Sequence, residues 1–178
     1  MGRAVRAFGT DELEALDRVV PVARELTGQY YALPDNWFDT ASHEVRTVKD
    51  LRPGEVLGEG RLAQIRKLYR VLGEGAGRVL RCHTLCPHYR ICLQDHNILD
   101  SLCREPTVPL PDLLTCVLTH EYVHLVRFCR FEHSYDSPAT NRGGEEALVG
   151  EITRTIVSEL GHRGLRRAAD RLRAHPQG

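Results

Sequence analysis

The sequence predicts an α+β fold, rich in helices, in which a small sheet packs against one buried helix. The chain has 178 residues, 42% of them hydrophobic and 27% charged, which suits one compact domain over residues 1–178. Residues 112–131 carry apolar side chains around almost the whole helical circumference, a pattern typical of a buried central helix. Short runs with strand character supply the sheet, at residues 43–51, 79–82 and 89–93.

The N-terminal segment, residues 1–78, is expected to be helical and extended. A helix begins at Thr10, which precedes two acidic residues of the first turn. Apolar residues at helical spacing continue this helix to about Leu26, before Gly28. Pro21 lies inside the pattern, so the helix either kinks or restarts there.

Between this helix and the central helix, the sequence predicts short elements joined by turns. Residues 30–38 are expected to form a packed loop, and residues 62–71 are a helix-like run between glycines. Residues 97–103 predict a short helix. The proline-rich run at 106–111 is a rigid connector that leads into the central helix.

After the central helix, the sequence predicts a polar loop and two further helices. The loop covers residues 132–144, and helical patterns follow at 145–160 and 165–174. The last helix, within residues 162–174, is basic, which is typical of a solvated surface helix.

Composition and charge exclude several classes of protein. Lysine plus arginine, 24 residues, equals aspartate plus glutamate, 24 residues, so nucleic acid is not an expected partner. The N-terminus lacks the apolar core of a signal peptide, and no apolar stretch approaches the roughly 18 residues of a membrane span. We therefore expect a soluble, cytoplasmic protein that does not bind membranes.

Residues 120–124 read HEYVH, which fits the motif HExxH, inside the central helix. Residues four apart on a helix are rotated by about 40°, so His120 and His124 project from one face and can bind one metal ion. Glu121 is rotated by about 100° from His120, so it lies beside the ion, where it can act as a general base. Unpaired polar groups in so apolar a helix would be costly, which favours a bound ion over hydrogen-bonded core histidines.

A catalytic zinc site needs a third protein ligand, and the next predicted helix offers two glutamates. Helical phase favours Glu145, because it lies within about 60° of the apolar residues at 148, 149, 152, 156 and 160. Glu146 lies about 100° further around, at the edge of that face, and stays a candidate. Glu151 lies on nearly the opposite side and is not expected to be a ligand.

The chain resembles the zincin metallopeptidases of the gluzincin type, which carry HExxH on one helix and a glutamate ligand on a second helix downstream. Residues 145–148, EEAL, are similar to the thermolysin-type segment NEAI, and this alignment favours Glu146. The likeness covers about residues 79–160, the expected metal-binding core. Residues 89–94 resemble the edge strand of the minimal bacterial zincin-like domains, which can pair with an extended peptide. The resemblance implies one Zn²⁺ ion and a peptide or protein substrate.

Four further residues are candidates for the same site. Gluzincins often carry an acid four residues after the ligand glutamate, and neither corresponding position here is acidic. Asp95 or Asp136 is therefore the candidate for orienting a ligand histidine. His133 and Tyr135 lie between the two metal helices and can donate hydrogen bonds to an oxyanion. His133 and Asp136 also stay open as third ligands, outside any ligand motif.

The chain has six cysteines, at positions 82, 86, 92, 103, 116 and 129. Cys82, Cys86 and Cys92, with nearby histidines, offer a second zinc site, but their spacing matches no common zinc knuckle. We therefore interpret them as thiols in or near the core. Cys116 and Cys129 fall in the central helix and are expected to be small buried hydrophobic residues.

These observations predict a zinc metallopeptidase in which Glu121 is the general base and the metal stabilises the oxyanion. The residues themselves indicate a hydrolytic metal site, and the peptide bond as substrate comes from the resemblance alone. The alternative is a non-catalytic protein that keeps the fold for a regulatory or binding role. A third possibility is a structural domain in which the two histidines are only packed.

Overall fold

The computed structural model describes residues 5–68, 88–135, 139–161 and 163–174. Within these ranges the chain forms six α-helices, three strands and two short 3-10 helices, which confirms the expected α+β class. The helices are α1 (Thr10–Tyr30), α2 (Trp37–Thr40), α3 (Asp95–Arg104), α4 (Leu110–Cys129), α5 (Ala139–Ser158) and α6 (Arg163–Ala174). The strands are β1 (His43–Arg46), β2 (Ala63–Leu68) and β3 (His88–Leu93), and the 3-10 helices are Val48–Asp50 and Pro53–Glu55.

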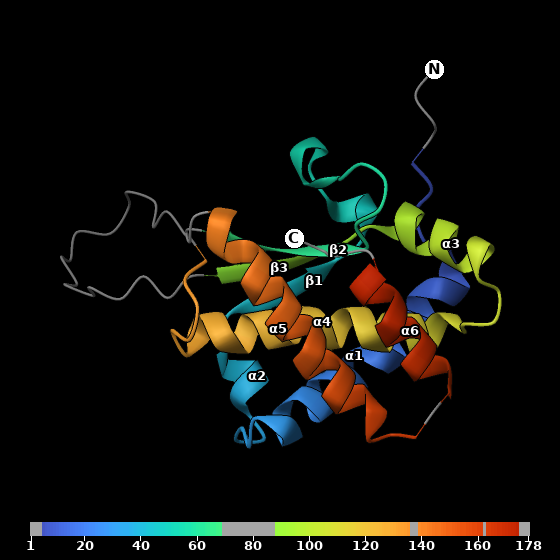
Figure 1. The fold of residues 1–178 in the computed structure, drawn as a ribbon. Helices are drawn as coiled ribbons and strands as arrows, with labels where there is room; N and C mark the ends of the chain where they lie inside the picture. The colour runs from blue at the N-terminus through green and yellow to red at the C-terminus, as the bar shows by residue number, and fades with distance from the viewer. Residues whose placement is uncertain (1–4, 69–87, 136–138, 162, 175–178) are drawn as a thin grey trace, which may run out of the picture.

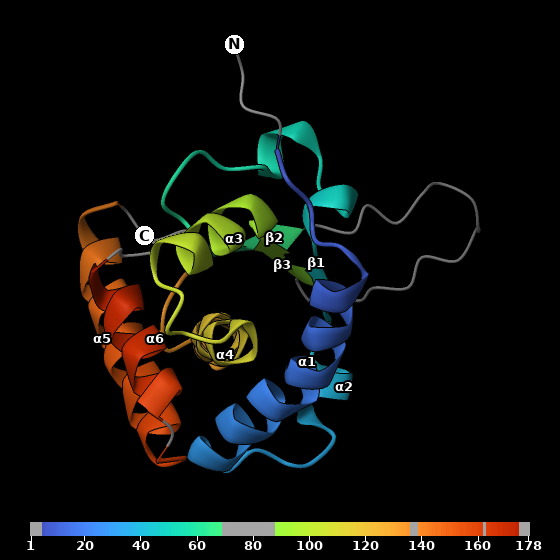
Figure 2. The ribbon, with the colours of Figure 1, turned by 90° about the vertical axis from the view of Figure 1, so that its right-hand side faces the viewer.

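Helix α4 lies at the centre of the fold, as its apolar circumference predicted. Every residue from Leu113 to Val126 is buried. Figure 2 looks along α4 and shows α1 on one side, α5 and α6 on the other, and α3 with the sheet above. Helices α1, α5 and α6 and strand β2 all contact it. Because α4 has no solvated face along this stretch, each polar group on it must find a partner inside the protein.

The sheet lies over α4, with β3 in the middle (Figure 1). Strand β1 runs parallel to β3, and β2 runs antiparallel to it. The expectation that residues 89–94 form an edge strand is therefore wrong, because β3 has a neighbour on both sides. Residues 89, 91 and 93 of β3 are buried hydrophobic side chains, as expected for a strand that packs on a helix.

Strand β2 replaces the helix-like run predicted at residues 62–71, and that prediction is wrong for residues 63–68. Leu62, Ile65 and Leu68 are spaced by three, which imitates a helical stripe in a short window. All six residues of β2 are paired with β3, and this pairing, remote in sequence, overrides the local pattern.

Several predicted boundaries shift, and one predicted strand cannot be compared. The strand expected at 43–51 ends at Arg46, because Asp95 accepts a hydrogen bond from the amide of Val48 and a 3-10 turn follows. The polar loop expected at 132–144 is shorter, since α5 already begins at Ala139. The strand expected at 79–82 lies outside the described residues. The short helix near 97–103 and the last helix lie within two residues of their expected bounds, and the helix expected at 145–160 is present but begins at Ala139.

Helices α1 and α4 end in the same way, with a residue other than glycine in the left-handed conformation. Ala32 has φ 49° and Phe131 has φ 57°. After α4, the amide of Glu132 donates to the carbonyl of Arg127, and the amide of Phe131 donates to that of Phe128. This pair of bonds is the Schellman motif, in which the left-handed position is usually glycine.

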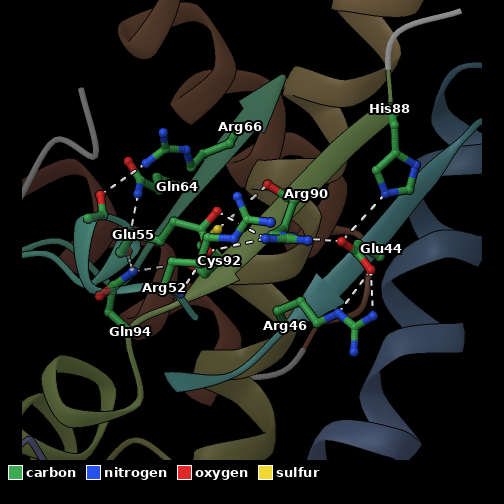
Figure 3. A network of polar contacts seen from close by, with 11 residues as sticks. Glu44, Arg46, Arg52, Glu55, Gln64, Arg66, His88, Arg90, Cys92 and Gln94 are labelled. Atoms are coloured by element: carbon green, nitrogen blue, oxygen red, sulfur yellow. Dashed lines mark hydrogen bonds and ion pairs between the residues drawn. The ribbon is translucent and has the colours of Figure 1, made fainter. Parts of the chain in front are cut away.

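An ion-pair network covers the face of the sheet that points away from α4. Figure 3 shows Arg90 between two glutamates, with its Nε 2.6 Å from Glu44 and its Nη1 3.0 Å from Glu55. Arg46 also binds Glu44, at 2.6 Å. Glu55 is 4% exposed and belongs to the second 3-10 helix, so the network attaches that turn to β3. Paired charges avoid the desolvation penalty that a lone buried charge would carry.

We predict that Phe131→Gly stabilises the protein. A left-handed conformation costs an L-residue about 1–2 kcal/mol, part of which the extra chain entropy of glycine cancels. Phe131 is 92% exposed, so its removal loses little packing. The free energy of unfolding, measured by urea denaturation, should rise by about 0.5–1 kcal/mol. Phe131→Ala, which keeps the β-carbon, is the control, and equal effects of the two substitutions would contradict this explanation.

We also predict that Glu44 makes stability depend on acid pH. Burial raises the pKa of Glu44, but hydrogen bonds from Arg90 and Arg46 outweigh it and hold the pKa at about 2, against an ordinary 4.5. Its contribution is therefore complete above about pH 4.5 and is lost as the pH falls toward about 2. Urea denaturation of wild type and Glu44→Gln should give a stability difference that shrinks over this range. A difference that stays constant would mean that the carboxylate charge is not involved.

Candidate metal centre

The HEYVH segment lies in the middle of α4, and its ionisable side chains are buried. His120, Glu121 and His124 are 3%, 2% and 5% exposed. One helical turn brings the two imidazole rings together, with centroids 4.9 Å apart. Two imidazole rings in so apolar a place are costly unless their nitrogens bind a hydrogen-bond partner or a metal ion, and rings this close can bind the same one.

That partner is Glu146 of α5. Its Oε2 lies 3.3 Å from Nε2 of His120, and its Oε1 lies 3.2 Å from Nε2 of His124. One ligand atom from each of the three residues lies within 4.8 Å of the others, and within the described ranges this is the one group of three or more His, Cys, Asp or Glu side chains that can hold a metal ion.

The dimensions of the cluster fit a small divalent ion. In a tetrahedral site with metal–ligand bonds of about 2.1 Å, two ligand atoms are about 3.4 Å apart. Each imidazole Nε2 lies close to that distance from one oxygen of Glu146, that of His120 from Oε2 and that of His124 from Oε1. Two imidazoles and one carboxylate also leave one tetrahedral position open.

The protonation states of the cluster also suit metal binding. Burial lowers the pKa of His124, which favours the neutral imidazole. Burial raises the pKa of Glu146, but hydrogen bonds from both imidazoles outweigh it and hold that pKa well below its usual range. Neutral imidazole and ionised carboxylate are the forms that bind metals. The Nδ1 atoms of His120 and His124 are buried without a hydrogen-bond partner, so each ring uses only its Nε2 side.

Glu145, the residue that helical phase favoured, has a different partner. Both of its oxygens accept hydrogen bonds from Arg127, at 2.7 and 2.9 Å. Its Oε2 also lies 3.5 Å from Nδ1 of His133, and its Oε1 lies 3.9 Å from Nδ1 of His124. The carboxylate of Glu145 is thus behind His124, on the side away from Glu146.

Helical phase favoured Glu145 because two of the residues that defined the buried face are not buried. Leu148 is 40% exposed, and Leu160 is 42% exposed and lies beyond the end of α5 at Ser158, whereas Thr153 and Val157 of α5 are buried. With these two included, the buried stripe is centred between Glu145 and Glu146, and both carboxylates turn toward α4. The similarity of residues 145–148 to the thermolysin-type segment favoured Glu146, and Glu146 is the glutamate that lies beside His120 and His124.

Glu121 lies in a pocket next to the cluster. The pocket has a volume of about 180 Å³, and its wall includes Glu121, His124 and Glu146 together with residues of the strand β2. Burial raises the pKa of Glu121 to about 7, so its carboxyl group can both accept and release a proton near neutral pH. The full lining consists of Arg61, Gln64, Ile65, Glu121, His124, Phe128, His133, Tyr135, Glu145 and Glu146.

His133 and Tyr135 line this pocket. The Tyr135 hydroxyl donates to the carbonyl of Ile65, at 3.5 Å. The amide of Gln94 donates to Leu62, and because bonded pairs alternate along an antiparallel ladder, the Ile65 carbonyl points away from β3, to the outer edge of the sheet. Tyr135 therefore contacts β2 through its hydroxyl, and its ring also lies beside that of Tyr89 in β3, with the centroids 6.4 Å apart.

The two aspartates proposed to orient a ligand histidine have different outcomes. Asp95 is not at the site, because it accepts hydrogen bonds from the amides of Phe8 and Val48 and so attaches two N-terminal segments to α3. Asp136 lies outside the described residues. Among the described residues, the carboxylate nearest to the back of a cluster histidine is that of Glu145.

Two residues of this region, Arg127 and Arg61, were not singled out from the sequence. Arg127 is three residues after His124, so it shares a helical face with the histidines, and that spacing could have identified it. Arg61 carries no local signal, because it reaches the pocket only through the pairing of β2 with β3.

The described members of the proposed second zinc site do not gather. Cys92 is buried in β3, and burial raises the pKa of its thiol to about 12, which disfavours the metal-binding thiolate. His88 contacts Ser42 and Glu44, and His96 contacts the carbonyl of Leu57. Cys82 and Cys86 lie outside the described residues. Cys116 is buried, as expected, and Cys129 is partly buried.

We predict that a divalent transition-metal ion stabilises the protein through Glu146. A ligand that binds only the folded state at a hundredfold excess over its Kd adds about 2.7 kcal/mol to the free energy of unfolding. Thermal unfolding with and without Zn²⁺ should show this gain in wild type and lose most of it in Glu146→Gln. The exposed Glu151 on the same helix gives the control Glu151→Gln, which should behave as wild type. An equal gain in all three proteins would place the ion elsewhere.

Comparisons with models of protein families, with curated proteins and with solved structures find no match for this chain. None of the helices in the described part of the chain has the length and apolar character needed to cross a membrane.

Proposed function

We propose that this protein is a zinc-dependent metallopeptidase that hydrolyses peptide bonds. The observation that carries the proposal is the convergence of His120, His124 and Glu146, with the buried Glu121 in the adjoining pocket. Two nitrogen ligands and one oxygen ligand, with one tetrahedral position open, form the donor set of catalytic zinc sites. When bound, zinc supplies a Lewis acid that polarises a carbonyl group and lowers the pKa of water.

Glu121 is the general base of this proposal. Its carboxylate accepts a proton from the attacking water, and the protonated form then gives that proton to the departing amine. A base with a pKa near the working pH serves both steps, and burial gives Glu121 such a pKa, about 7. Its place on α4, one residue after a metal ligand, fixes its carboxyl group beside the cluster.

His133 and Tyr135 are the proposed hydrogen-bond donors toward the substrate. Both residues line the pocket, and the hydrogen bond that the Tyr135 hydroxyl donates to the Ile65 carbonyl is long, 3.5 Å, so a substrate can replace it. Donors held at a pocket wall stabilise negative charge that develops on a carbonyl oxygen during the reaction.

Arg127 and Glu145 support the metal ligands in this proposal. The bidentate pair between them fixes the carboxylate of Glu145 behind His124. At 3.9 Å the carboxylate makes no hydrogen bond to Nδ1 of His124, but its negative charge favours the tautomer whose Nδ1 carries the proton, which leaves Nε2 free for the metal. We assign to this pair the role toward His124 that the sequence gave to Asp95 or Asp136.

The peptide substrate is supported by the order of the elements. An HExxH helix followed by a helix that presents a ligand glutamate is the arrangement that the gluzincin resemblance implies. The pocket also borders the edge strand β2, a position where an extended chain can lie.

The decisive variant is Glu121→Gln. It removes the base but leaves all three ligands, so hydrolysis of a mixed peptide library, followed by mass spectrometry, should fall by about 10²–10⁴-fold. Metal analysis of the same variant should still give about one zinc ion per chain. Glu151→Gln is the matched control and should keep full activity. If zinc-loaded wild type cleaves no peptide, the peptidase proposal is wrong.

A further inference from the structure

We propose that Arg61 selects substrates that carry a carboxylate, by pairing its guanidinium with that group in the pocket beside the metal cluster. This inference rests on the proposed peptidase function and names the substrate chemistry that the function leaves open. A peptide offers a carboxylate from two sources, an acidic side chain or its free C-terminus. Both present two oxygens in one plane, which the planar guanidinium can bind with two parallel hydrogen bonds.

Arg61 is a cation of the pocket wall that pairs with no anion among the described residues. It lines the same pocket as Glu121, His124 and Glu146. Among the described residues, no hydrogen bond or ion pair engages its guanidinium, whereas Arg127 is paired with Glu145. An arginine that faces a pocket without a partner offers its hydrogen-bond donors to whatever enters.

The backbone that carries Arg61 is fixed before any ligand arrives. The side chain of Asn97, at the start of α3, donates to the carbonyls of Arg61, at 2.7 Å, and Gly58, at 2.8 Å. The amide of Gln94 donates to the carbonyl of Leu62, at 2.8 Å. Both Asn97 and Gln94 are buried, so these anchors are stable. Binding groups held by such supports lose little entropy when the ligand binds.

The charges around the pocket explain why a cation is needed there for such a substrate. Glu145 is neutralised by Arg127, and Glu146 is held by the two imidazoles. Glu121 is a third acid in the wall of the same pocket. A substrate carboxylate that enters next to these acids needs a cation beside it, and Arg61 is a cation of that wall that no ion pair engages among the described residues.

The test compares kcat/KM for matched peptides between wild type and two variants of Arg61. The peptides differ in one group only: Glu against Gln at each position around the cleaved bond, and a free against an amidated C-terminus. The proteins are zinc-loaded wild type, Arg61→Gln, Arg61→Lys and the control Arg66→Gln. Arg66 lies on β2, which follows Arg61 in the chain, but its side chain donates to the carbonyl of Gly54 on the face of the sheet that points away from α4. Circular dichroism and zinc content establish that each variant is folded and loaded.

We expect kcat/KM for the carboxylate peptides to fall about 10- to 100-fold in Arg61→Gln, with less than about threefold change for the uncharged peptides. Arg61→Lys should recover part of the preference, because it keeps the charge and loses the two-pronged geometry. Arg66→Gln should resemble wild type. The peptide pair that responds identifies the source, the acidic side chain or the C-terminus. An equal fall in kcat/KM for charged and uncharged peptides would overturn the inference, because Arg61 would then act only on Glu121. No change in kcat/KM for any peptide would also overturn it.

Binding measurements separate this inference from the proposed function. Fluorescence anisotropy of labelled peptides with zinc-loaded Glu121→Gln protein reports affinity without turnover. The ratio of Kd values for the uncharged and charged peptides should be about 10 or more with Arg61 present and should approach 1 in the double variant with Arg61→Gln. If wild type cleaves nothing but this ratio behaves as stated, the peptidase proposal fails and the role of Arg61 stands. If peptides are cleaved but the ratio is near 1 in both proteins, the role of Arg61 fails alone.

Discussion

The fold is organised around ionisable side chains placed inside its most apolar helix. Two histidines and a glutamate on α4 lie where nearly every neighbour is a hydrocarbon, and each would be costly there without a partner. Glu146 supplies the partner for both imidazoles from α5, and this contact requires α5 to pack against α4 in one register. The arrangement of the two helices and the geometry of the candidate metal site are therefore consequences of the same interaction.

The parts of the fold that depend on local pattern could be predicted from the sequence. The central helix follows from its continuous apolar surface, and β3 follows from buried residues at alternate positions. Helix α1 shows where local signals mislead, because Gly28 suggested the end and the helix runs on to Tyr30. The left-handed residue that ends it is Ala32, which no propensity rule identifies. Strand β2 was missed since its partner lies about twenty-five residues away in sequence.

The candidate site divides in the same way. The pair of histidines and the neighbouring Glu121 are fixed by helical geometry, so their arrangement was visible in the sequence. The choice between Glu145 and Glu146 depends on how α5 is rotated about its axis against α4. Apolar spacing alone placed the buried face of α5 about 50° from its position in the structure. Both glutamates turned out to face α4, one toward the imidazoles and one toward Arg127. Partners of this kind, which lie on different elements, have no signature in one segment of sequence.

The polar network on the outer face of the sheet gives the pocket a rigid wall. Arg90 holds Glu55, and the carbonyl of Glu55 accepts hydrogen bonds from Gln64 and Gln94. Gln94 in turn accepts from the amide of Leu57, and Asn97 of α3 donates to the carbonyls of Gly58 and Arg61, so the chain that leads to Arg61 is attached to the end of β3 and the start of α3. The network lies on the opposite face of the sheet from α4 and takes no part in metal binding. Its effect on the site is geometric, because hydrogen bonds on the far side of the loop fix the backbone that carries Arg61 at the pocket before a ligand binds.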